Sequence, residues 1–236
     1  MTASTRPQTS TLRIGGLLWT IGPAWYVLCE AIAASAFHGY NYATFYISDL
    51  GVPEFGELEG RTLASRLPQV MDAGFIGAGV LFLLGLVVLL ASLRSGVPKA
   101  LLAGFGILHA VGIVFVGLVP GSPQNVDSGL IIIHVLGAVA AIAGGNLAAI
   151  SSTCALRQSG LSRSVRSLGM VLGIAGLLSA VLLTLHWVLP DGVWERGAVY
   201  SFMLWQLLIG ITLRTGAGTA RHGRPLRQTP SMSAKQ

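Results

Sequence analysis

Charged side chains are scarce in this sequence. Asp, Glu, Lys and Arg make up 10% of the 236 residues, whereas 53% of the residues are hydrophobic. A typical soluble domain carries about 25% charged residues, so a soluble fold of this length would have too few charges to cover its surface. The composition excludes a soluble enzyme, a disordered chain and a disulfide-rich secreted module. It predicts an integral membrane protein.

Motifs of several common enzyme classes are also absent. The chain has no GxxxxGK[ST] loop, no GxGxxG after a strand, no GxSxG turn, no CxxCH and no HExxH. These absences argue against nucleotide-binding, α/β-hydrolase, c-type haem and zinc-protease chemistry. The chain has only two cysteines, Cys29 and Cys154, in apolar stretches that the predicted topology places near opposite faces of the membrane. We expect no disulfide between them and interpret both as small buried packing residues.

Six apolar stretches are long enough to form transmembrane helices, which need about 20 residues each. They cover residues 14–37, 71–93, 99–119, 129–154, 166–189 and 197–214. We therefore predict an all-α polytopic membrane protein with six transmembrane helices in one bundle (14–214). A tail of residues 1–13 precedes it, a loop of residues 38–70 separates the first two spans, and a basic tail of residues 215–236 is expected to be disordered.

The positions of the basic residues predict the orientation of the bundle. Of the 15 Lys and Arg residues, all except Arg61, Arg66 and Arg196 fall on the side of the two termini. Because basic residues concentrate in cytoplasmic loops, both termini are expected in the cytoplasm. The net charge of +6 reflects this bias, so no nucleic-acid partner is expected.

Ionisable side chains in the spans are candidates for function, because each costs about 2.5–3.5 kcal/mol at the centre of a membrane helix. His109 lies nearer the middle of the membrane, and so does the neutral Asn146. The others share a depth near the outer ends of the helices, namely Glu30, Asp49, Asp72, His134, His186, Glu195 and Arg196. If these groups also converge laterally, they form a polar pocket that opens outward between helices.

Three interpretations of this polar belt remain open. His134 and His186 with Asp49 or Asp72 could form a zinc site, although their spacing is not that of a known motif. The same groups could instead form a metal-free acid–base or lipid-headgroup pocket. In the third interpretation they bond to one another and only fix the register of the helices.

The adjacent residues Glu195 and Arg196 open the last span and cannot both point the same way on a helix. A carboxylate such as Glu195 is favoured at a helix N-terminus. Arg196 could hold a phosphate or carboxylate through two hydrogen bonds. Alternatively, Arg196 forms an ion pair with Asp49 or Asp72.

Five separated motifs occur in order along the chain, namely YISDLG (46–51), RLPQVMDAGF (66–75), GLVPGSPQNVDSG (117–129), HVLGAVAAIAGGNLAAI (134–150) and WERGAVYSFMLWQLLIG (194–210). In these motifs the chain resembles the bacterial multi-pass membrane family named domain of unknown function 998, over about residues 14–214. The resemblance implies a six-helix bundle and no particular activity. It directs attention to Ser48, Asp49, Asp72, His134, Asn146, Glu195, Arg196 and Tyr200. Where the family pattern is His-x-x-Met-Asn, this chain has Pro68 and Asp72, which weakens a shared metal or acid–base mechanism.

These observations predict an outward-facing polar pocket that binds a lipid headgroup or belongs to a membrane-embedded enzyme. The candidate catalytic residues are Asp49, Asp72 and His134, and the candidate binding residues are Ser48, Asn146, His186, Glu195, Arg196 and Tyr200. The alternatives are a small-solute or proton-coupled carrier and a non-catalytic membrane subunit. The expected partners are the bilayer of a bacterial cytoplasmic membrane and an anionic lipid or headgroup. The sequence identifies no cofactor, metal or protein partner.

Overall fold

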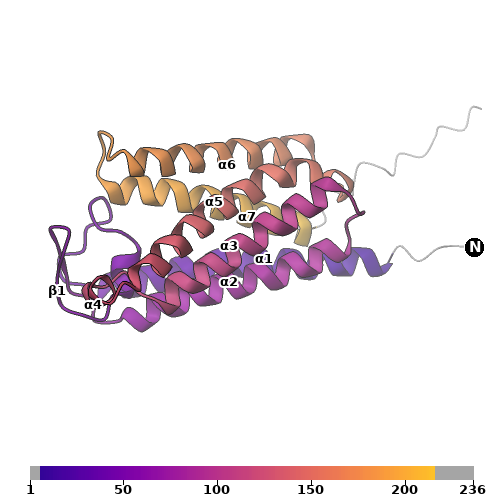
Figure 1. The fold of residues 1–236 in the computed structure, drawn as a ribbon. Coiled ribbons are helices and arrows are strands. Elements are labelled where there is room, and N and C mark those ends of the chain that lie inside the picture. The colour runs from indigo at the N-terminus through magenta and orange to yellow at the C-terminus, as the bar shows by residue number, and fades with distance from the viewer. Residues whose placement is uncertain (1–5, 216–236) are drawn as a thin grey trace, which may run out of the picture.

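The computed structural model describes residues 6–215, which form a bundle of long helices (Figure 1). The six long helices are α1 (Arg6–Ser35), α2 (Pro68–Ala91), α3 (Val97–Leu118), α5 (Ile131–Ala155), α6 (Arg163–Thr184) and α7 (Asp191–Thr215). Each contains a stretch that is long and apolar enough to cross a membrane. This confirms the prediction of an all-α membrane protein with six spans. The basic tail predicted at residues 215–236 lies outside the described residues from 216 onward.

The helices form a ring in which each long helix packs against the next one along the chain. Helix α1 packs against α2, α2 against α3, α3 against α5, α5 against α6 and α6 against α7, and α7 returns to pack against α1. Helix α1 begins and α7 ends at the same end of the bundle (Figure 1). We call this the terminal end. An even number of spans requires this arrangement, because each span reverses the direction of the one before it.

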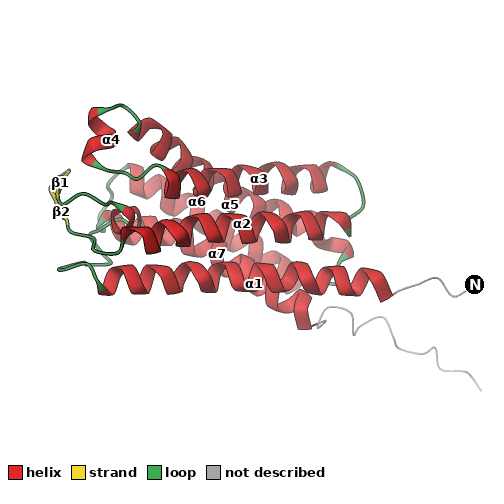
Figure 2. Ribbon diagram, turned by 90° about the horizontal axis from the view of Figure 1, so that it is seen from below, coloured by secondary structure: helices red, strands yellow, loops and turns green. Residues whose placement is uncertain are grey.

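The opposite end, which we call the hairpin end, carries the short elements (Figure 2). They are the 3₁₀ helix η1 (Ser48–Gly51), the strands β1 (Gly56–Leu58) and β2 (Arg61–Leu63), and the short helix α4 (Pro123–Asp127). The two strands are antiparallel, with Leu58 opposite Arg61. The two residues between them, Glu59 and Gly60, have φ of 49° and 76°, the left-handed conformation that a tight hairpin turn requires. The sequence analysis predicted a loop over residues 38–70 without this hairpin.

Buried aromatic side chains fill the middle of the bundle toward the terminal end. The Trp19 ring stacks on Phe82 with a centroid distance of 5.1 Å and meets the edge of Trp205 at the same distance. All three side chains are at most 1% exposed. The indole of Trp19 donates to the Phe82 carbonyl oxygen at 3.0 Å, so its polar atom is satisfied within the apolar core.

Helix α6 touches its neighbours through three glycines. Gly169, Gly173 and Gly176 are the residues of α6 that are buried. A Cβ atom at Gly173 would lie 2.6 Å from the Asn146 carbonyl oxygen of α5, and one at Gly176 would overlap the Asn146 side-chain amide. Small residues allow this close approach of two helix backbones, as is common between membrane helices. Beyond Gly176, toward the hairpin end, α6 has no further buried residue.

The boundary between the last two helices differs from the sequence-based expectation. The span predicted at 166–189 ends at Thr184, and the span predicted at 197–214 begins at Asp191. The intervening segment contains His186 and Val188 with φ of 48° and 54°, which breaks the helix. Hydropathy does not detect this break, because Leu185, Val188 and Leu189 continue the apolar run of the helix. Cys154 is also exposed rather than buried, whereas Cys29 is buried, and both cysteines are free.

The glycine contact between α5 and α6 predicts a position-specific effect of one added methyl group. Gly176→Ala should lower the free energy of unfolding by about 1–3 kcal/mol, because the new Cβ overlaps the Asn146 amide. Gly104→Ala on α3 is the matched control, since a Cβ there meets nothing within 4 Å. Thermal unfolding in detergent measures both variants. Equal melting temperatures for the two would contradict the close packing of α5 on α6.

Candidate functional site

Arg196 fixes the segment that follows α1 to the start of α7. Its Nη1 donates to the carbonyl oxygens of Tyr42 at 2.6 Å, Phe45 at 2.9 Å and Gly192 at 3.2 Å. Gly192 lies directly against the same segment, because a Cβ there would be within 2.8 Å of the Phe45 and Tyr42 carbonyl oxygens. The guanidinium therefore pairs the Tyr42 and Phe45 carbonyl groups of the loop, which lie outside helices and strands.

The second nitrogen of the same guanidinium forms a buried ion pair with α1. Nη2 of Arg196 donates to Glu30 Oε1 at 3.1 Å and also to the Tyr40 hydroxyl. The other oxygen of Glu30 accepts from the Tyr200 hydroxyl at 2.6 Å. The partner of Arg196 is therefore Glu30 rather than Asp49 or Asp72, and its terminal nitrogens are committed. Arg196 and Tyr200, both predicted as binding residues, thus bond to Glu30 within the protein.

A cavity of about 730 Å³ lies between α5 and α6 at the hairpin end. Its walls are apolar residues of the two helices, namely Val135, Ala138, Val139, Ile142 and Ala143 of α5 and Leu177, Ala180, Val181 and Leu183 of α6. We call the space between these walls the α5–α6 groove. Val139 and Val181 line it and are also more than half exposed. The groove is therefore open, and it lies beyond Gly176, where α6 has no buried residue.

The polar end of the groove is built around Asp49, which lies in η1 and is 2% exposed. Its Oδ2 accepts from Arg61 Nε at 2.9 Å and from the Tyr46 backbone N–H at 2.9 Å. The Arg61 guanidinium lies 4.2 Å from the centre of the Tyr46 ring, a cation–π contact. Its terminal nitrogens reach Glu59 Oε2 at 3.3 and 3.4 Å. Burial raises the pKa of Asp49, and the Arg61 guanidinium opposes this shift without cancelling it.

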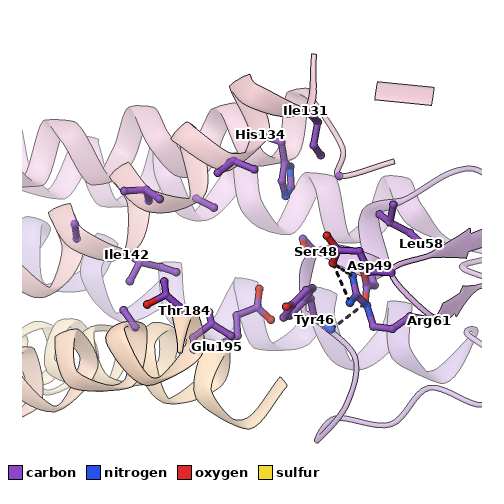
Figure 3. A pocket seen from close by; sticks show the side chains of 18 of the residues that line it. Tyr46, Ser48, Asp49, Leu58, Arg61, Ile131, His134, Ile142, Thr184 and Glu195 are labelled. Atoms are coloured by element: carbon purple, nitrogen blue, oxygen red, sulfur yellow. Dashed lines mark hydrogen bonds and ion pairs between the residues drawn. The ribbon is translucent and has the colours of Figure 1, made fainter. Parts of the chain in front are cut away.

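His134 and Glu195 reach the same cavity from α5 and α7 (Figure 3). His134 lies in the first turn of α5, and its Nδ1 is 2.8 Å from the Val119 carbonyl oxygen. Because a carbonyl oxygen only accepts, Nδ1 carries the proton, and Nε2 of the neutral ring carries a free lone pair. One oxygen of Glu195 accepts from the Ile47 backbone N–H. Ser48, between these groups, also lines the cavity.

The remaining predicted site residues lie elsewhere. Asp72 does not line the cavity, and its Oδ1 is buried without a hydrogen-bond partner among residues 6–215. Asn146 is fully buried and donates to the carbonyl oxygens of Ile142 and Ala198, so it joins α5 to α7. His186 is exposed and pairs with Asp191 at 2.9 Å. The structure thus brings together Ser48, Asp49, His134 and Glu195 and separates Asp72, Asn146, His186, Arg196 and Tyr200 from them.

The zinc interpretation does not fit this arrangement. Within residues 6–215, no group of three or more His, Cys, Asp or Glu side chains is placed to hold a metal ion. His134 and His186 belong to different surroundings, because His134 bonds to Val119 and His186 bonds to Asp191. The polar end of the groove is a set of hydrogen-bonding and charged groups.

A family model described as "Protein of unknown function (DUF998)" matches residues 20–212. The match spans well over half of the chain and includes every residue that lines the cavity. The chain belongs to the DUF998 family. This confirms the resemblance seen in the separated motifs. No curated protein and no solved structure matches the chain.

In this DUF998 protein, sequence reasoning missed three residues of the polar end, namely Tyr46, Glu59 and Arg61. Tyr46 appears in the sequence analysis only as the first residue of the YISDLG motif, and in the structure its hydroxyl donates to Asp191 at 2.8 Å. Arg61 was noted only as one of the few basic residues away from the termini. That rarity was the available signal, because a lone cation near several carboxylates needs a partner. The hairpin turn that carries Glu59 beside Arg61 was not predicted.

The buried Arg196–Glu30 pair predicts a large loss of stability when only one partner is removed. Arg196→Met should cost about 3–5 kcal/mol, because it leaves the Glu30 carboxylate buried without its cation. The double variant Glu30→Gln/Arg196→Met should recover part of this loss. Arg163→Met, at an exposed position of α6, is the control. Tryptophan fluorescence during thermal unfolding in detergent reports all three, and an Arg196→Met variant as stable as Arg163→Met would refute the anchoring role.

Proposed function

We propose that this protein binds a membrane lipid in the α5–α6 groove, with the headgroup at the polar end. The observation that supports this most directly is the two-part lining of one open cavity. Its polar groups gather around Asp49, Arg61, His134 and Glu195, whereas its walls along α5 and α6 are apolar. Ligand sites of comparable size combine a mostly apolar lining with a few polar groups that fix orientation.

The depth of the two parts matches the two parts of a lipid. Asp49 and Arg61 lie outside the apolar helices, and Thr184 is the last residue of α6. The wall from Thr184 to Leu177 then extends about 10 Å inward along the helix axis. A headgroup at the polar end would therefore place an acyl chain along the wall, within the hydrocarbon layer.

Packing toward the terminal end favours binding over transport. A carrier needs a polar path to the opposite face, and His109 and Asn146 are the predicted polar residues nearest the middle of the membrane. Asn146 instead bonds to backbone carbonyls, and the His109 ring packs against Phe82 and Phe202. Trp19 and Trp205 lie in the same buried aromatic cluster. These side chains support a groove that ends within the bundle.

The orientation of the groove is part of the proposal. The hairpin end carries Arg61, Arg66 and Arg196, and every other Lys and Arg falls in segments on the side of the termini. The distribution of basic residues supports cytoplasmic termini in a bacterial cytoplasmic membrane, with the polar end of the groove facing outward. Glu57 lies on the exposed face of β1. Labelling of a Glu57→Cys variant from outside the cell tests this orientation.

Filling the groove should remove the bound lipid. Ala180→Phe places a ring in the space between the two walls, and we expect at least about tenfold less lipid to remain bound, since overpacking of this kind costs 1–3 kcal/mol. Ala175→Phe is the matched control, because Ala175 is exposed on the same helix and does not line the cavity. Native mass spectrometry after mild detergent extraction counts the lipid on each. Equal lipid on both variants would contradict a site in the groove.

A second candidate function is acid–base chemistry on the bound headgroup. It is favoured by the free lone pair of His134 Nε2 in a cavity that also contains Asp49 and Ser48. His134→Asn keeps a donor for the Val119 carbonyl oxygen and removes that lone pair. We expect this variant still to hold lipid along the apolar walls of the groove and to lose any headgroup product that mass spectrometry detects after incubation with a lipid extract. A product formed equally by both proteins would exclude His134 as the base.

A further inference from the structure

The polar end of the groove has more acidic than basic side chains. Asp49, Glu59 and Glu195 line it, whereas Arg61 is the single Lys or Arg among the described residues of the lining. Arg61 is already paired, because its Nε bonds to the buried carboxylate of Asp49. Arg196 offers a headgroup no free terminal nitrogen, since both serve Glu30, Tyr40 and backbone carbonyl groups. An anionic headgroup would meet net repulsion here.

The same end also has more hydrogen-bond acceptors than donors. Within residues 6–215, no donor bonds to Asp49 Oδ1, to Glu195 Oε1 or to His134 Nε2. Asp49, Glu195 and His134 line the cavity, so a ligand held there displaces the water that can reach these atoms. An acceptor that loses its water and gains no donor is unfavourable. A ligand that fits this end therefore brings N–H or O–H donors of its own.

We propose that the lipid held in the α5–α6 groove carries a primary ammonium in its headgroup. This inference rests on the proposed function. A primary ammonium has three N–H donors, one positive charge and no acceptor. These properties complement three unfilled acceptors, two of which belong to carboxylates. The ammonium lies among Asp49, His134 and Glu195, and the acyl chain follows the apolar wall.

A phosphate next to that ammonium can bind to Arg61. The terminal nitrogens of Arg61 contact Glu59 at 3.3 and 3.4 Å, and the Glu59 side chain is 70% exposed. Such an exposed contact is weak, so a phosphate oxygen can replace it and gain two charge-assisted hydrogen bonds. The site thus suits a zwitterionic phosphoethanolamine-type headgroup, with its phosphate at Arg61.

A quaternary ammonium fits less well. It has no N–H donor, so it leaves all three acceptors unfilled. Its usual recognition is by faces of aromatic rings, and the Tyr46 face is already covered by the Arg61 guanidinium at 4.2 Å. The geometry therefore distinguishes primary amines from choline headgroups of the same charge.

The test compares three photoreactive lipids that differ only in headgroup. Analogues of phosphatidylethanolamine, phosphatidylcholine and phosphatidylglycerol, each with a diazirine in the acyl chain, are added to the full-length protein in phosphatidylcholine vesicles. Labelled peptides are then quantified for residues 135–143 and 177–184. We expect the ethanolamine lipid to label these segments at least about tenfold more than the other two, the difference that charge-assisted hydrogen bonds give.

Variants at the carboxylates test the cause of the preference. Glu195→Gln keeps an oxygen for the Ile47 N–H and removes the charge, and Asp49→Asn does the same for the Tyr46 N–H. Each should reduce the ethanolamine preference severalfold. Glu57→Gln removes a charge from β1 at a position outside the cavity lining and should leave the preference unchanged. Circular dichroism and gel filtration confirm that each variant is folded.

The outcomes separate the two claims. Equal labelling of the groove by all three lipids, or strongest labelling by phosphatidylglycerol, would overturn the ammonium inference and leave lipid binding standing. Labelling spread over the outer surfaces of the helices, with none enriched in the groove, would overturn the proposed function itself. A preference that survives both Glu195→Gln and Asp49→Asn would also overturn the inference.

Discussion

The Arg196 guanidinium holds the loop after α1 against both α1 and α7. It is buried, with its side chain 9% exposed, and it pairs with a Glu30 carboxylate that is 2% exposed. Such a pair does not by itself guarantee stability, because both ions lose their water. Here the pair and the other bonds of Arg196 fix the position of residues 40–45. Through these residues they also position the 3₁₀ helix that carries Ser48 and Asp49. The bonds of Ile47 to Glu195 and of Tyr46 to Asp191 hold the following residues to α7 and complete the geometry of the polar end.

The groove follows from how one helix distributes its small residues. Gly169, Gly173 and Gly176 bring the terminal-end half of α6 against its neighbours, and the half beyond them has no glycine and no buried residue. The helices consequently separate toward the hairpin end, where short elements supply the polar groups. One sequence feature thus produces close packing on one side of Gly176 and an open apolar wall on the other.

Much of the fold could be predicted because a bilayer demands long apolar runs, and six such runs are plain in the sequence. The shared depth of Asp49, His134 and Glu195 also followed from their distance to the ends of these runs. Lateral neighbours could not be predicted, since Glu30 and Arg196 are 166 residues apart. The Arg61–Asp49 pair could not be predicted either, because Arg61 is placed by the β1–β2 hairpin, which has only six strand residues. The end of α6 was misplaced because backbone conformation at His186 and Val188, not hydropathy, terminates it.

The central claim is that the α5–α6 groove is a lipid site, and the most direct measurement is an electron cryo-microscopy map of the protein in nanodiscs of defined lipid. The account predicts elongated density along Val139 and Val181 that ends in a headgroup beside Asp49, Glu195 and His134. A map in which α5 and α6 close on each other, or in which lipid density follows the outer helix surfaces and leaves the groove empty, would contradict it.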